Sequence, residues 1–244
     1  MTTLGYLYKL QKENFTMDNG RLAEFITGLG RFNDYGSTVA QTKKALESNC
    51  TSHLNQENDD VVIFSDCLKA INKVMNLEFD VNSIILVNSQ FDGDSEEQPK
   101  NPGRLRDGLK YPHTDKIVVK LWPGDNGIVI HEPPLQIDKP DLQKFVNEWH
   151  VSEKTIIEGW QLFAKLACLQ PFQDGNKRTA LISANHALGT LKTQAYIVPP
   201  TGRHFNRFMT DLLEYYHYSN EPNGVNALNN FTMFATTYGK LNRS

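Results

Sequence analysis

The sequence predicts a mainly α-helical protein with one β-hairpin. Residues 138–150 and 152–169 repeat apolar side chains at intervals of three and four, which is typical of helices. Residues 117–131 instead carry two β-rich arms on either side of the turn sequence PGDN, which predicts a hairpin. The length of 244 residues allows one large domain or two small ones.

The N-terminal part has weaker patterns. Four segments are compatible with helices or short strands, and their ends stay open: residues 20–30, 38–48, 64–76 and 78–87. Residues 88–116 are rich in Asp, Ser, Pro and Gly, so they are expected to form a loop region. We therefore expect a mostly helical region at 1–102 and a core at 103–244.

The two helices that follow the hairpin have clear apolar faces. In the first, Asp138 is the expected N-cap and Pro140 lies in the first turn. Its apolar face consists of Leu142, Phe145, Val146 and Trp149. The second helix is apolar over a wider arc, which predicts a central, buried position. Its stripe consists of Ile156, Trp160, Phe163, Ala164 and Ala167.

Pro171 is expected to end this second helix. Proline has no N–H to donate, and the residue before it avoids the α region. The loop QPFQDGN follows, and a new helix should start near Asn176 or Lys177 and run through KRTALISANHALGTL. A last predicted helix covers 204–218, and its apolar face is formed by Phe205, Phe208, Met209, Leu212, Leu213 and Tyr216.

The loop has the composition of a phosphate site. A helix N-terminus presents unpaired N–H groups to an anion, and Gly175 lets the backbone approach a ligand closely. Lys177 and Arg178 add positive charge, and Asp174 beside them suggests a Mg²⁺ ion. A polar loop that serves only capping and solubility is the alternative, and composition alone does not separate the two. The spacing is not that of a Walker A motif.

The run QPFQDGNKRTA resembles the active-site motif of the Fic/Doc family, HxFx[D/E][G/A]N[G/K]R. The resemblance covers roughly residues 103–220 and implies a Fic-type helical bundle in which a β-hairpin flap, here 117–131, lies next to the loop. The segment EPPL and the helix after it also resemble the family's connection from the flap. The core at 103–244 is thus expected to be Fic-like.

The resemblance implies transfer of AMP from Mg-ATP to a hydroxyl of a target protein. Asp174 would hold Mg²⁺, and Phe172 would anchor the loop in the core. The nucleotide-binding positions would be Gly175, Asn176, Lys177 and Arg178. The spelling NKR is closer to the Doc-like branch, in which a kinase-type transfer is also known. The family's frequent second arginine is Leu181 here, which weakens the expected grip on the terminal phosphate.

The family's general base is missing. Gln170 and Arg178 occupy the catalytic positions, but Gln170 stands where the family has histidine. A carboxamide can orient a hydroxyl but cannot deprotonate it, and general-base assistance is worth about 10²–10⁴-fold in rate. Three explanations stay open: a slow or redirected enzyme, a nucleotide-binding pseudoenzyme, and an engineered substitution. His131 on the flap is a possible replacement, although a strand histidine is more often solvated surface.

A fainter resemblance concerns the family's inhibitory helix, [S/T]xxxE[G/N]. The segment GSTVAQTKKAL at 36–46 places Ser37 at the Ser/Thr position and Gln41 at the glutamate position. An amide at Gln41 would form only a neutral hydrogen bond with Arg178. A plain surface helix is the alternative reading.

Composition limits the partners. The net charge of −3 gives no long-range attraction to nucleic acid, and no apolar run is long enough to span a bilayer. The N-terminal MTTLGYLYKLQKENF lacks the pattern of a signal peptide, so the expected location is the cytoplasm. A target protein is expected to dock on the flap 117–131 by strand addition. A non-catalytic module that binds a nucleotide or a partner, or a Doc-like kinase-type toxin, are the alternatives.

Overall fold

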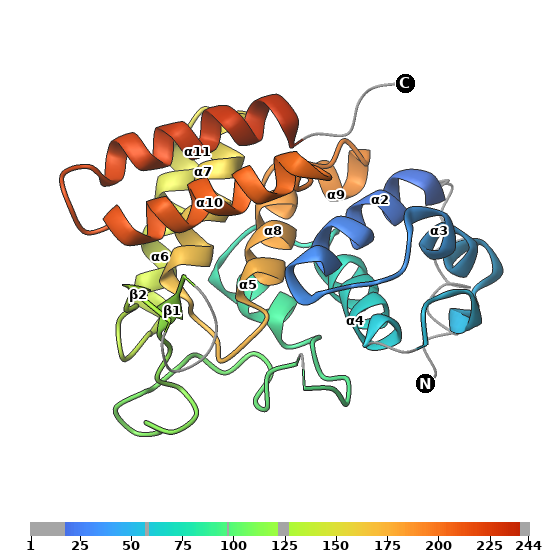
Figure 1. Cartoon of the computed structure of the whole chain (residues 1–244), viewed down its shortest axis with the longest axis horizontal. Helices are drawn as coiled ribbons and strands as arrows, with labels where there is room; N and C mark the ends of the chain where they lie inside the picture. The colour runs from blue at the N-terminus through green and yellow to red at the C-terminus, as the bar shows by residue number, and fades with distance from the viewer. Residues whose placement is uncertain (1–17, 57–58, 97, 122–126, 240–244) are drawn as a thin grey trace.

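The computed structural model describes residues 18–56, 59–96, 98–121 and 127–239. This part of the chain is mainly helical and contains a two-stranded antiparallel sheet, which confirms the predicted fold class (Figure 1). The α-helices are α2 Asn19–Gly30, α3 Val39–Ser48, α4 Asp60–Val74, α5 Val81–Asn88, α6 Lys139–Val151, α7 Ile156–Leu169, α8 Asn176–Ala187, α9 Thr190–Thr193, α10 Arg203–Tyr218 and α11 Gly224–Tyr238. Short 3₁₀ turns lie at Arg31–Asn33 and Thr51–His53, and the strands are β1 Val119–Lys120 and β2 Val129–His131.

Helix α8 lies at the centre of the molecule. In Figure 1 it stands between α6, α7, α10 and α11 on one side and α2, α3 and α4 on the other. Its residues are buried on nearly every face, and it packs against α7, α5, α2 and α4. Buried residues from both sides of position 102 share one apolar cluster, while the division into 1–102 and 103–244 stays a prediction.

The four weak N-terminal patterns all prove to be helices, α2 to α5. Local capping explains two of their starts. The Thr38 side chain accepts from the Gln41 amide at the start of α3, and the Gln41 side chain accepts from the Thr38 amide in return. Asp80 and Ser83 form the same reciprocal pair at the start of α5. Such capping boxes satisfy backbone donors that a helix start leaves unpaired.

The helices after the hairpin largely match their predictions. Asp138 caps α6, with Pro140 in its first turn. The stripe of α7 is fully buried except for Ile156, which is exposed because it opens the first turn. Trp160 contacts Phe163, Phe208 and Phe231 edge-on, so it forms the centre of an aromatic cluster between α7, α10 and α11.

Two helix ends are followed by a left-handed residue. Helix α7 stops before Pro171 as predicted, and Gln170 then adopts a left-handed conformation with φ 52°. Helix α8 ends at Ala187 instead of continuing to Leu191, because Gly189 turns the chain with φ 72° before α9. Helix α11 was not predicted.

The hairpin is confirmed, with strands shorter than the predicted arms. Val119 pairs with His131 and Lys120 with Val129, with a register shift between the two pairs. The turn PGDN and the N-terminal MTTLGYLYKLQKENF, which lacks the pattern of a signal peptide, lie outside the described residues. None of the helices in the described ranges combines the length and apolar character needed to cross a membrane.

Candidate functional site

The loop between α7 and α8 is anchored by two of its side chains, those of Phe172 and Asn176. Phe172 is fully buried, as expected, and its backbone forms a β-bridge with Leu105. The Asn176 carboxamide accepts from the Phe172 amide at 2.8 Å and donates to the Phe172 carbonyl at 2.8 Å. The side chain of Asn176 therefore holds the loop from within, and a role of Asn176 in nucleotide binding stays a prediction.

The end of α5 forms the floor beneath Gly175. Gly175 has φ 73°, and a Cβ atom there would lie 2.6 Å from a ring carbon of Phe91. Asn88 donates to the Asp174 carbonyl at 3.0 Å and to the Thr179 hydroxyl at 3.2 Å. Sequence reasoning missed Phe91 and Asn88, because they fall where a weak helical pattern meets a loop-like segment.

The N-terminus of α8 has the properties of an anion site. Gly175 is its N-cap, and as a glycine it has no side chain that could cap the helix as a serine or aspartate at this position would. The half-buried Asp174 accepts from the Gly175 amide at 2.5 Å, and the half-buried Lys177 lies in the first turn. Backbone N–H groups, the positive end of the helix dipole and a lysine thus belong to the same first turn.

Arg178 lies inside the protein rather than on its surface. Its side chain is 0% exposed, and the guanidinium carbon lies 4.8 Å from the ring centroid of Phe91. Burial raises the pKa of the nearby Cys67 thiol to about 12, although the Arg178 charge acts in the opposite direction. In low-dielectric surroundings such a charge acts over a longer distance than in water. Arg178 therefore adds positive potential from behind the loop, and direct contact with phosphates stays a prediction.

Gln170 faces inward. It is 7% exposed, and its Nε2 donates to the Ala167 carbonyl at 2.8 Å, which caps the last turn of α7. The fully buried Tyr216 has a pKa raised well above its ordinary value, chiefly by burial. The residue at the base position thus has a structural contact in this conformation.

His131 is buried, so the expectation of a solvated strand histidine is wrong. Its Nε2 donates to the Cys168 carbonyl at 3.0 Å, and its ring centroid lies 5.7 Å from that of Tyr216. Burial lowers the pKa of His131 below its ordinary value. These contacts join β2 to α7 and α10, which gives His131 a packing role.

The candidate inhibitory residues have local contacts. The Ser37 hydroxyl hydrogen-bonds to the buried Asp60 and accepts from the Asn55 amide at 2.7 Å. The Gln41 oxygen accepts from the Thr38 amide at 3.0 Å and from its hydroxyl at 2.9 Å. These bonds fix the start of α3, and an inhibitory role for Ser37 and Gln41 stays a prediction.

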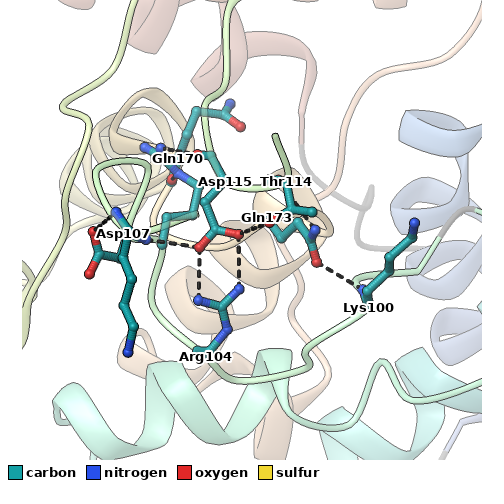
Figure 2. Close-up of polar contacts among 9 residues, drawn as sticks. Lys100, Arg104, Asp107, Thr114, Asp115, Gln170 and Gln173 are labelled. Atoms are coloured by element: carbon teal, nitrogen blue, oxygen red, sulfur yellow. Dashed lines mark hydrogen bonds and ion pairs between the residues drawn. The ribbon is translucent and has the colours of Figure 1, made fainter. Parts of the chain in front are cut away.

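The segment 98–116 supports the loop from outside, around Asp115 (Figure 2). Asp115 has a fully buried side chain that accepts from Arg104 at 2.8 Å and from the Asp107 amide at 2.9 Å. Burial opposes its ionisation, but the hydrogen bonds from Arg104, Asp107 and Thr114 outweigh it and hold the pKa of Asp115 below its ordinary value. Gln173 of the loop then donates to the Thr114 carbonyl at 3.2 Å. No sequence pattern had pointed to this network.

Residues 81–188 match the family model described as the Fic/DOC family. The matched span begins at α5 and ends just after α8, so it contains the floor at Asn88, the hairpin and the loop. The geometry defines a helical scaffold that presents a helix N-terminus beside a hairpin, and residues 81–188 of this scaffold are similar to the Fic/DOC family. No curated protein matches the chain at a significant level.

Proposed function

We propose that the loop 170–178 binds Mg-ATP and that the protein is a Fic-type adenylyltransferase of low activity. The observation that carries the proposal is the start of α8, where Gly175 with φ 73° packs against Phe91 and brings the helix N-terminus to the loop without a capping side chain of its own. A nucleotide phosphate supplies the negative charge that such a terminus favours. The Fic/DOC match supports a Fic-type transfer in the broad sense, and AMP transfer to a protein hydroxyl is the specific reaction that we propose.

Magnesium fits this loop through one carboxylate. The described residues contain no group of three or more His, Cys, Asp or Glu side chains placed to hold a metal. Mg²⁺ at nucleotide sites is typically held by one or two carboxylates together with substrate phosphates and water. Asp174 at the N-terminus of α8 would be that carboxylate, and the ion would neutralise phosphate charge.

Low activity follows from Gln170. Without a base, the loop still positions phosphates and stabilises developing charge, which are separate contributions to rate. The missing proton transfer would slow the reaction by about 10²–10⁴-fold. Leu181, at the position of the family's frequent second arginine, is fully buried, so the terminal phosphate gains no cation from that position.

The hairpin is the proposed docking place for the target protein. Its sheet has two strands in the described residues, so backbone groups at its edges can pair with an added strand. Leu121, Ile128 and Val129 are exposed on the hairpin. Such apolar side chains offer contact area for an extended target segment.

A nucleotide-binding pseudoenzyme is the second candidate. The inward-facing carboxamide of Gln170 favours it, since that side chain is already hydrogen-bonded to Ala167. A Doc-like kinase-type transfer remains the third reading and rests on Lys177 in the NKR sequence.

Calorimetric titration with ATP, with and without Mg²⁺, tests the binding site. We expect Mg²⁺-dependent binding that is weakened by at least about tenfold in Asp174→Ala and in Lys177→Ala. Lys44→Ala, on the exposed face of α3, is the matched control and should bind like the wild type. Arg178→Ala is a poor test, because removing a fully buried guanidinium can disturb folding. Binding that is absent, or unchanged in both loop variants, would contradict the proposal.

Gln170→His separates the enzyme from the pseudoenzyme. If the scaffold is catalytic, the new imidazole should raise transfer of labelled AMP by about 10²-fold or more. The variant must first be shown to fold and to bind Mg-ATP like the wild type. No gain in such a protein would favour the pseudoenzyme.

A further inference from the structure

Arg106 joins three segments that meet at the loop. Its side chain is 1% exposed, and it donates to three backbone carbonyls. Nε bonds to the carbonyl of Gln170, Nη1 to that of Asp115 at 2.8 Å, and Nη2 to that of Pro134 at 3.0 Å. The acceptors belong to the loop, to the segment 98–116 and to the chain that leaves the hairpin.

The backbone of Arg106 repeats the same connection. Its amide donates to the Pro171 carbonyl at 3.0 Å, and its carbonyl accepts from the Ile137 amide at 3.0 Å. Two successive peptide groups of the loop, at 170 and 171, are therefore held by one residue. Burial lowers the pKa of Arg106 to about 10, so the side chain keeps its charge at neutral pH. Hydrogen bonds from a charged donor are roughly twice as strong as neutral ones.

The first residue of the loop needs such support. Gln170 has φ 52°, and the left-handed region costs a residue with a side chain about 1–2 kcal/mol. The following proline adds a further restriction on this residue. Arg106 binds its carbonyl, so the conformation is held through the backbone, whatever side chain stands at 170.

Asp115 helps to fix the position of the Arg106 guanidinium. Its carboxylate binds Arg104 and the Asp107 amide, and this fixes the Asp115 carbonyl to which Arg106 donates at 2.8 Å. Figure 2 shows the Asp115 carboxylate between Arg104 and the backbone of Asp107, with Gln170 close by. The carboxylate thus acts on the loop through Arg106.

We infer that Arg106 is a positioning residue that sets the start of the loop, and with it the N-terminus of α8, against the end of the hairpin. The expected effect of Arg106 on nucleotide binding rests on the proposed function, whereas its effect on the conformation of the loop does not. Loss of Arg106 should loosen residues 170–176 and the chain at 134–137 together, while α10 and α11 remain protected.

Hydrogen exchange of Arg106→Lys tests this without a ligand. A lysine keeps the charge but lacks the planar fork that reaches three carbonyls. We expect amides in 170–177 and 134–137 to exchange about tenfold faster or more, with unchanged exchange in α11. Arg31→Lys is the matched control, because Arg31 also donates to two backbone carbonyls, Pro199 at 3.3 Å and Pro200 at 3.2 Å. That control should leave the loop at wild-type rates.

Two results would overturn the inference. One is wild-type exchange of the loop in folded Arg106→Lys; the other is a uniform loss of protection over the whole chain. If Arg106→Lys does not fold, Asp115→Asn replaces it, and faster exchange at 170–177 with a protected α11 is again required. Mg-ATP titration of the same variants should show at least about tenfold weaker binding for Arg106→Lys and wild-type binding for Arg31→Lys. A wild type that does not bind Mg-ATP would end the proposed function, while the exchange result would still decide the inference.

Discussion

Gly175→Ala probes the packing beneath the loop. The added methyl carbon would lie 2.6 Å from Cδ2 of Phe91 and 3.2 Å from Nδ2 of Asn88, which is closer than these atoms can approach without movement. The φ of 73° adds about 1–2 kcal/mol for a residue with a side chain. Overpacking a buried site costs about 1–3 kcal/mol. We therefore expect the free energy of unfolding to fall by about 2–5 kcal/mol.

Gly189→Ala is the matched control for this substitution. Gly189 has φ 72°, but no described residue beyond its own stretch of chain comes within 4 Å of the point that an added Cβ would occupy. Only the backbone cost of about 1–2 kcal/mol therefore applies. Urea unfolding followed by circular dichroism gives both values, provided that the two variants share the wild-type slope. Equal losses in the two variants would refute the claim that Phe91 and Asn88 fill the space behind Gly175.

Two further predictions concern stability. Lys154 is exposed and has φ 58°, so Lys154→Gly should raise the free energy of unfolding by about 1 kcal/mol. Lys44→Gly inside α3 is the control and should lower the free energy of unfolding by about as much. Calorimetric melting measures both variants, and a lower stability in both would contradict the prediction. The pKa of Asp115 is depressed in the folded state, so its stabilisation is complete well above pH 4 and is lost as the pH falls from about 4 through the folded-state pKa. In Asp115→Asn, the free energy of unfolding measured with urea should therefore fall less steeply as the pH is lowered at about pH 3–5. An unchanged pH dependence would show that Asp115 does not contribute to the acid sensitivity of the fold.

Much of the fold follows from local patterns in the sequence. The helix around Trp160, the cap at Asp138 and the start of α8 at Asn176 depend on periodicity and on residue types that act within a few positions. Helix α11 was missed because several asparagines interrupt its apolar pattern, although Phe231 and Ala235 are fully buried.

The supports of the site depend on distant contacts instead. Arg106 and the loop are 64 positions apart, and Asn88 and Asp174 are 86 apart, so no local pattern could pair them. Burial of Arg178 and His131 could not be predicted either, because a charged or polar residue on a helix or strand is usually exposed. The motif therefore predicted where the loop lies, and tertiary packing decided which way its side chains face.

The contacts of Asn88 and Phe91 have a practical consequence for dissecting the protein. Both residues precede position 102, yet they hold Asp174 and fill the space behind Gly175. A fragment that began at residue 103 would carry the complete motif QPFQDGNKR without the surface on which it rests. The smallest fragment that retains a native loop must therefore include α5. If a shorter fragment fails to bind a ligand, the missing contacts of Asn88 and Phe91 would explain the failure, and the motif residues themselves would not be tested.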